Sequence, residues 1–215
     1  MGWDFFCKIF CVSVRESTDR RTETRKQFAA VGLLDRVEFY IVEKDKHPED
    51  IERGIYESHI KCIQKGLDAG ARHILIFEDD ILFDRFDAEK LKACTQFLKS
   101  KKEWKVLLLG CLVNGLKPTE SKSVMKVKHR SLSHAYALNR KFAREIVRIP
   151  WPGCAYDCLF CPMTKESMPS IRRLHFKAIP LQATPSIWIW KGAGGFLEGL
   201  NAFKNLTSFF TATAR

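Results

Sequence analysis

Residues 72–84 read RHILIFEDDILFD and join an apolar run to three consecutive carboxylates. The run 74–77 contains no Gly or Pro and is too short for a helix, so we expect a strand buried on both faces. Glu78, Asp79 and Asp80 follow it directly. Because strand side chains alternate between faces, Glu78 and Asp80 should point one way and Asp79 the other.

Adjacent carboxylates at the end of a buried strand are costly, because desolvation and mutual repulsion both oppose their ionisation. A bound divalent cation would cancel this charge. Oxygen ligands favour a hard ion such as Mn²⁺ or Mg²⁺, which proteins often share with substrate phosphates. The alternative is a solvated acidic turn after a core strand, since Asp and Glu are common at such positions.

The chain has 215 residues and a formal net charge of +11, which indicates one domain and an anionic partner. Candidate partners are a nucleotide, a phosphorylated acceptor and an anionic membrane surface. The basic residues are scattered and form no nucleic-acid-binding motif, so we expect no nucleic acid. We find neither a signal peptide nor an apolar stretch of roughly 18 residues. These features predict a cytoplasmic protein, with peripheral contact at the inner membrane face as a further expectation.

Apolar segments alternate between strand-like and helix-like patterns through the first half of the chain. This alternation predicts an α/β fold with a mostly parallel, Rossmann-like sheet flanked by helices in a single domain. Ligands bind such sheets at the carboxyl ends of the strands, where three loops should converge. These loops are 15–21, 78–80 and 110–114.

Six motifs in chain order resemble glycosyltransferase family 25, which includes bacterial lipopolysaccharide glycosyltransferases and collagen galactosyltransferases. The similarity spans roughly residues 5–190. The motifs are Ser17-Thr18-Asp19-Arg20-Arg21, Glu57-Ser58-His59-Ile60, Leu75-Ile76-Phe77-Glu78-Asp79-Asp80, Leu107-Leu108-Leu109-Gly110, His134-Ala135-Tyr136-Ala137-Leu138 and the later Asp157.

The resemblance implies a GT-A fold, a UDP-sugar donor, Mn²⁺ or Mg²⁺, and inverting transfer of galactose or a similar sugar to a glycan or glycoconjugate acceptor. We expect the single domain to comprise a nucleotide-sugar half (1–110) and an acceptor half (111–195). The helical spacing of apolar residues predicts a C-terminal amphipathic helix (196–215). A non-catalytic nucleotide- or glycan-binding module on the same fold is the alternative, because a fold does not secure a function.

The resemblance also suggests roles for individual residues. Asp80 is the expected leading metal ligand, assisted by Glu78 or Asp79, with His175 as a late histidine ligand; a half-buried structural histidine is the alternative for His175. Asp157 is the candidate general base, and a helix N-cap is its alternative. The expected donor-binding side chains are Arg20, Arg21, Ser58, His59, Asp79 and His134.

We expect Ser58 and His59 to begin a helix, whose free amides would favour phosphate. Solvation is the alternative for the two arginines. Helix capping and packing are the alternative for Ser58 and His59, and packing is the alternative for His134 and Tyr136. Trp188 and Trp190 are candidates for stacking on a sugar ring, with core packing as the more ordinary interpretation.

Cys154, Cys158 and Cys161 have the three-cysteine spacing of radical-SAM iron–sulfur proteins. That chemistry normally needs a barrel of about 200 residues. Too little chain follows Cys161 to build one, so the iron–sulfur cluster is a remote alternative. A zinc site or a disulfide pair is the other interpretation of this loop.

Overall fold

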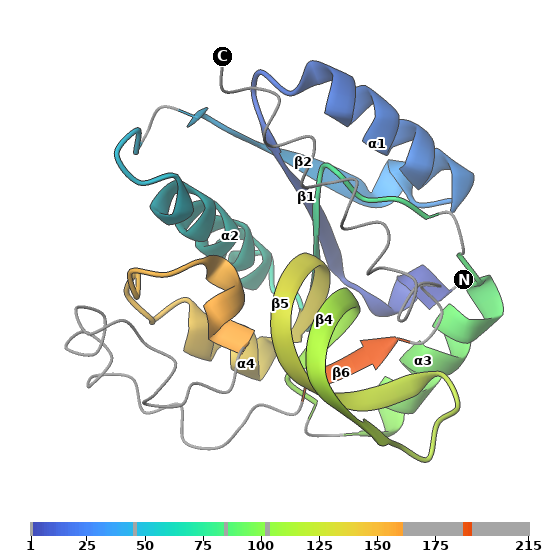
Figure 1. Ribbon diagram of the computed structural model, residues 1–215. Coiled ribbons are helices and arrows are strands. Elements are labelled where there is room, and N and C mark those ends of the chain that lie inside the picture. Colours follow the sequence, from blue (N-terminus) through green and yellow to red (C-terminus); the bar gives the residue numbers. More distant parts are fainter. Residues whose placement is uncertain (1, 45–46, 84–85, 102–103, 161–186, 191–215) are drawn as a thin grey trace.

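The computed structural model shows a twisted sheet between two layers of helices (Figure 1). The structure describes residues 2–44, 47–83, 86–101, 104–160 and 187–190. No helix in these ranges is both long and apolar enough to cross a bilayer. The strands are β1 (Lys8–Val14), β2 (Val37–Val42), β3 (His73–Glu78), β4 (Val106–Pro118), β5 (Val124–Asn139) and β6 (Ile187–Trp190). The helices are α1 (Thr18–Ala30), α2 (Ile51–Asp68), α3 (Ala88–Ser100) and α4 (Arg140–Ile146), with short 3₁₀ turns η1 (Gly2–Phe5), η2 (Leu34–Arg36) and η4 (Tyr156–Phe160).

The sheet order is β2-β1-β3-β5-β4-β6. β1 pairs in parallel with both β2 and β3, as expected for strands joined by helical crossovers. β5 then pairs antiparallel with β3 and with β4. The α/β fold with flanking helices is therefore confirmed, and its sheet is mixed. The antiparallel part arises because β4 and β5 are joined by a short turn, which can connect only antiparallel neighbours.

Two hydrophobic cores lie on opposite faces of the sheet. One packs Phe10, Ile76 and Tyr136 against α2, α4 and η4. The other packs Cys11 and Phe77 against η1, α1 and α3. Neighbouring residues of one strand thus enter different cores, as their alternation requires. Helices covering both faces explain why the interior of β3, residues 74–77, is apolar.

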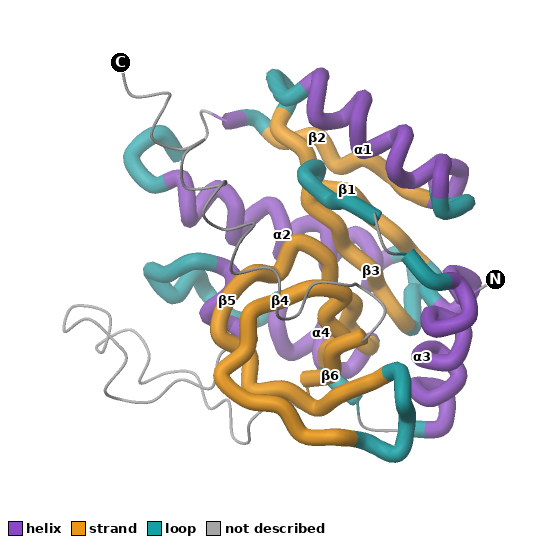
Figure 2. The backbone as a smooth tube through the Cα atoms, turned by 45° about the vertical axis from the view of Figure 1, so that its right-hand side comes forward, coloured by secondary structure: helices purple, strands orange, loops and turns teal. Residues whose placement is uncertain are grey.

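The hairpin formed by β4 and β5 bends strongly (Figure 2). Four register shifts interrupt its ladder between Leu108 and Gly115, and such bulges bend and twist a strand. The bend brings the start of β5 beside β6, which also pairs in parallel with the start of β4. β6 therefore closes the hairpin on itself.

Three elements bear on the expected site. α2 begins at Ile51, well before Ser58 and His59, because Asp50 caps it by accepting a hydrogen bond from the Arg53 amide. Val124–Asn139, which includes His134, is the single strand β5. Trp188 and Trp190 lie on strand β6. The predicted helix 196–215 lies outside the described residues.

Candidate active site

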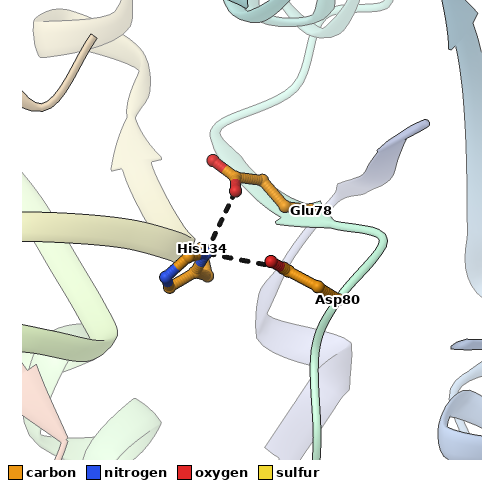
Figure 3. A group of neighbouring side chains, drawn as sticks. All are labelled: Glu78, Asp80 and His134. Atoms are coloured by element: carbon orange, nitrogen blue, oxygen red, sulfur yellow. Dashed lines mark hydrogen bonds and ion pairs between the residues drawn. The ribbon is translucent and has the colours of Figure 1, made fainter. Parts of the chain in front are cut away.

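Glu78, Asp80 and His134 form one cluster at the carboxyl end of β3 (Figure 3). His134 Nδ1 lies 3.0 Å from Glu78 Oε2 and 3.4 Å from Asp80 Oδ1. One ligand atom from each residue lies within 4.8 Å of the others, and no other such group of metal-ligating side chains occurs in the described residues. Two carboxylates and an imidazole suit Mn²⁺, which accepts both oxygen and nitrogen ligands. We name this cluster the triad.

The sheet positions the triad. Glu78 is the last residue of β3, and Asp80 lies in the turn that follows. β5 runs antiparallel beside β3 with Phe77 opposite Ala135, so His134 lies next to the strand end. All three side chains are partly exposed, at 31% for Glu78, 44% for Asp80 and 41% for His134. They can therefore meet both a metal ion and a ligand from solvent.

Two buried side chains, His59 and Tyr136, contact each other on the core side of the triad, and His59 also contacts Glu78. His59 Nδ1 lies 2.8 Å from the Tyr136 hydroxyl, and its Nε2 lies 3.6 Å from Glu78 Oε1. His59 is 1% exposed and stacks on the Tyr156 ring. The carboxylate of Glu78 is thus held between two histidines.

The charges of the triad stabilise one another. Hydrogen bonds to Asp80 and Glu78 raise the pKa of His134 to about 10, although burial opposes this. Burial would raise the pKa of Glu78, but hydrogen bonds from His134 and His59 hold that pKa well below its usual 4.5. A protonated His134 therefore bridges two carboxylates in the metal-free protein.

Asp79 points to the opposite face, as strand alternation predicts. It is 5% exposed, accepts a 2.6 Å hydrogen bond from the Ser13 hydroxyl and pairs with Arg20 at 2.8 Å. Burial raises the pKa of Asp79, while Ser13 and Arg20 oppose the rise. The backbone carbonyl of Asp79 also accepts a hydrogen bond from Thr24. Asp79 and Arg20 thus join β3 to α1 and lie apart from the triad.

Arg21 is also occupied by the protein itself. Its guanidinium donates to the Val14 carbonyl, to the Arg15 carbonyl at 2.7 Å and to the Ser13 hydroxyl at 3.1 Å. These bonds shape the turn between β1 and α1. Arg20 is the more accessible of the two arginines, because about half of its side chain is exposed.

The expectation that Ser58 and His59 begin a helix is wrong. α2 starts at Ile51, so both residues lie within the helix, and their amides are used by its own ladder. The Ser58 hydroxyl donates to the Gly54 carbonyl at 2.7 Å. His59 reaches the triad through its ring instead.

Residues 49–150 match the family model described as glycosyltransferase family 25 (LPS biosynthesis protein). We name residues 49–150 the family 25 segment, because they are similar to this family. No curated protein matches the chain. The family 25 segment contains α2, β3, β4 and β5 and therefore all three triad residues.

Two solved structures are similar to the chain. One is a mannose-1-phosphate geranyltransferase from Thermus thermophilus, at 11% identity and a TM-score of 0.45, over 86% of this chain and 73% of that one. The other is a glycosyltransferase involved in the glycosylation of the major capsid of PBCV-1, at 10% identity and a TM-score of 0.41, over 70% of this chain and 72% of that one.

Asp157, the candidate base, contacts β5 directly before His134. Its Oδ2 accepts a 2.7 Å hydrogen bond from the Leu132 amide, and its Oδ1 accepts one from the Ser133 hydroxyl. Leu132 has a φ of 67°, a left-handed conformation that is unusual for leucine. Asp157 therefore holds a strained bend of β5.

Several expectations fall on residues whose position is not described. His175 and Cys161 lie outside the described residues, so neither the late histidine ligand nor the three-cysteine site can be traced. Cys154 is buried, and Cys158 is partly buried. Trp188 and Trp190 lie on β6, and only their backbone pairing is described.

The sequence reasoning placed His134 with the donor and not with the metal. The missing information was the β3–β5 register, which brings His134 beside Glu78. One signal was present in the sequence, because His134, Tyr136 and Leu138 share a face by alternation. A histidine at the open end of a buried face suggests a site there.

Proposed function

We propose that the protein is a metal-dependent, inverting glycosyltransferase that uses a UDP-sugar, with galactose or a similar hexose as the sugar. The observation that carries this proposal is the triad at the carboxyl end of β3, inside the family 25 segment. Open α/β sheets bind their ligands at this edge. The donor set of two carboxylates and one imidazole fits Mn²⁺ or Mg²⁺.

The ion would be held by Glu78, Asp80 and His134. In this proposal His134 takes the role of the histidine ligand that the sequence had assigned to His175, which lies outside the described residues. A bound divalent ion would neutralise the charge that develops on the departing diphosphate. His59 and Tyr136 keep Glu78 oriented toward this position. Arg20 is the proposed donor contact of this loop, because its side chain is about half exposed and Asp79 holds its guanidinium in place.

In the proposed transfer, the oxygen of an acceptor hydroxyl attacks the anomeric carbon of the sugar. The bond from that carbon to the diphosphate oxygen breaks, and its electron pair leaves with UDP. The hydroxyl proton passes to a carboxylate on the opposite face of the sugar, for which Asp157 remains the proposed base. In this proposal the acceptor is a glycan or glycoconjugate of surface-polysaccharide biosynthesis, bound by the part of the domain that follows residue 110.

The formal charge of +11 supports an anionic acceptor or contact with an anionic membrane at its cytoplasmic face. If either partner binds through this charge, its binding should weaken as the salt concentration rises. Dissolved ions screen the attraction between exposed charges over a Debye length of about 10 Å at 0.1 M salt.

The first test is UDP binding, measured by calorimetry in Mn²⁺ and in EDTA. Wild-type protein should bind UDP only with the metal, and Asp80→Asn should weaken this binding by at least roughly tenfold, because one charged ligand is lost. Asp35→Asn is the matched control, since Asp35 is an exposed carboxylate in η2, away from the triad. Equal UDP affinity in EDTA or in Asp80→Asn would contradict the proposal.

The second test separates catalysis from binding. Wild-type protein with Mn²⁺ should release UDP from one member of a panel of UDP-sugars, and Asp80→Asn should not. Metal-dependent UDP binding without release from any UDP- or GDP-sugar, with or without acceptor glycans, would favour the non-catalytic module.

A further inference from the structure

A pocket lies at the end of the sheet opposite the triad, where β3 begins. It has a volume of about 420 Å³ and is lined by residues from the start of β3, the end of α3 and the junction of β5 with α4. β3 separates His73 from Glu78 by about 17 Å at roughly 3.3 Å per residue. The pocket is therefore distinct from the triad.

The walls of this pocket are strongly basic. Five cationic side chains line it, and no lining residue is acidic. They are Arg72, Lys99, Lys101, Arg140 and Lys141. We name this site the basic pocket. Like charges gathered around one cavity repel one another, so an anion that entered it would relieve this repulsion.

The partners of these cations leave much of the charge uncompensated. Lys101 pairs with Glu120 at 3.3 Å, and Arg140 donates to the neutral carbonyls of Leu67 and Ala71. Within the described ranges, no carboxylate forms an ion pair with Arg72, Lys99 or Lys141. Arg140 is thus fixed in place, while three further cations remain available to a ligand.

The positive charge of the basic pocket also acts on His73, which lies in its wall. It stacks on Phe5 at 4.0 Å, and its Nδ1 lies 3.0 Å from the Phe5 carbonyl oxygen. Burial lowers the pKa of His73, and the charges of Arg72 and Lys99 lower it further. An anion bound beside Arg72 would act in the opposite direction.

We propose that the basic pocket binds a phosphate-bearing anion, either a phosphorylated small molecule or a phospholipid headgroup. Arg72 contributes a planar guanidinium, which recognises phosphate with two parallel hydrogen bonds, and the lysines contribute point charges. The volume of about 420 Å³ falls within the range of small-molecule sites. The proposal does not depend on the proposed glycosyl transfer.

The test is calorimetric titration of the full chain with pyrophosphate in EDTA, so that no metal assists binding at the triad. The double variant Arg72→Gln/Lys141→Gln changes two exposed side chains and should raise the Kd at least tenfold. The control Lys117→Gln/Lys128→Gln removes the same charge from exposed lysines of the β4–β5 hairpin and should leave the Kd within about twofold.

Two outcomes would overturn the proposal: a double variant that binds pyrophosphate like wild type, or a control that loses as much affinity as the double variant. The first would place the binding elsewhere, and the second would reduce it to overall charge. Asp80→Asn should bind pyrophosphate in EDTA like wild type, and a loss there would also contradict the proposal. The His73 ring resonance should shift on binding in wild type and not in the double variant.

A vesicle experiment distinguishes the two sources of phosphate. Wild-type protein is sedimented with phosphatidylglycerol vesicles and with phosphatidylcholine vesicles. Binding to the former that is lost in the double variant and competed by pyrophosphate supports a lipid headgroup. Pyrophosphate binding without sedimentation supports a soluble phosphorylated ligand.

Discussion

Glu78, Asp79 and Asp80 carry the same functional group, and their positions give them different partners. Glu78 faces His59 and His134, whereas Asp79 faces Ser13 and Arg20 on the other side of the sheet. One carboxylate therefore contributes to a candidate metal site while its neighbour ties two elements together. A substitution at either position should be interpreted by these partners.

We expect the triad to stabilise the metal-free protein over a defined pH window. The Glu78 pKa is lowered from 4.5 and the His134 pKa is raised from 6.5 to about 10. The stabilisation is therefore complete between pH 4.5 and 6.5. It declines as the pH rises from 6.5 through 10, where His134 loses its proton in the folded protein. It also declines as the pH falls from 4.5 towards the lowered pKa of Glu78, where the folded protein protonates that carboxylate.

His134→Gln tests this window, because glutamine keeps a hydrogen-bond donor without the charge. Since the side chains are partly exposed, we expect a difference of only about 1 kcal/mol between wild type and variant near pH 6. Urea unfolding in EDTA across the pH range measures it. A difference that stays constant from pH 6 to 10 would rule out the charge interaction.

The two carboxylates of the triad were predictable from local sequence, whereas the positions of His134 and Ser58 were not. Glu78 and Asp80 were predicted to share a side from strand alternation alone, and the structure confirms this placement. The place of His134 beside them depends on the register of β5, a non-local pairing that no local pattern encodes. The position of Ser58 within α2 was missed because the Asp50 cap, which starts that helix earlier, was not recognised.

At the scale of elements, α2 packs closely on β3 at one glycine. A Cβ at Gly66 would lie 2.7 Å from Ile74 Cδ1, whereas a Cβ at Gly54 in the same helix would meet nothing within 4 Å. Gly66→Ala should therefore destabilise the protein by about 1–3 kcal/mol through overpacking. Gly54→Ala should stabilise it by roughly 0.5–1 kcal/mol, because alanine favours the helix.

Chemical denaturation of both variants checks this pair of predictions. Gly54→Ala is the matched control, since it makes the same substitution in the same helix. If Gly66→Ala were as stable as Gly54→Ala, the close packing of α2 on β3 would be incorrect.

Asp157 links η4 to the bend of β5. Two substitutions distinguish this structural role from the proposed role of Asp157 as the general base. Asp157→Ala removes the acceptor for the Leu132 amide and should cost about 1.5–3 kcal/mol of stability. Asp157→Asn keeps an acceptor oxygen and should lose less stability. As a base, however, asparagine cannot take a proton, so both variants should lose transfer activity.

Unfolding and UDP release measured on the same two samples test this expectation. Full activity in Asp157→Asn would exclude Asp157 as the base. Equal stability of Asp157→Ala and wild type would exclude the structural link.

At the scale of the whole molecule, β6 closes the β4–β5 hairpin. Ile189 stands opposite both Leu108 and Met125, so the backbone of one short strand serves two ladders. Ile189→Pro removes a backbone donor from the sheet and should destabilise the protein by about 1 kcal/mol or more. Thermal unfolding measures the effect, and an unchanged transition temperature would argue against the closure.

The overall fold was predictable where local pattern dominates. The apolar runs near residues 8–14, 37–42 and 73–78 became β1, β2 and β3, with parallel pairing as expected. The curl of β4 and β5 was not predictable in the same way, because it depends on bulges and on pairing with β6 some 60 residues later (187 − 124 = 63). A pairing between residues so far apart in the chain produces no periodic pattern in the local sequence.

The closure by β6 also has a consequence for self-association. An exposed strand edge invites another chain to extend the sheet. Within the described sheet, β2 is the strand that keeps an unpaired side, and it carries Glu38 and the exposed Ile41. Damage to β6 would uncover fresh backbone on two strands at once, so we expect aggregation to begin there in a protein that loses that segment.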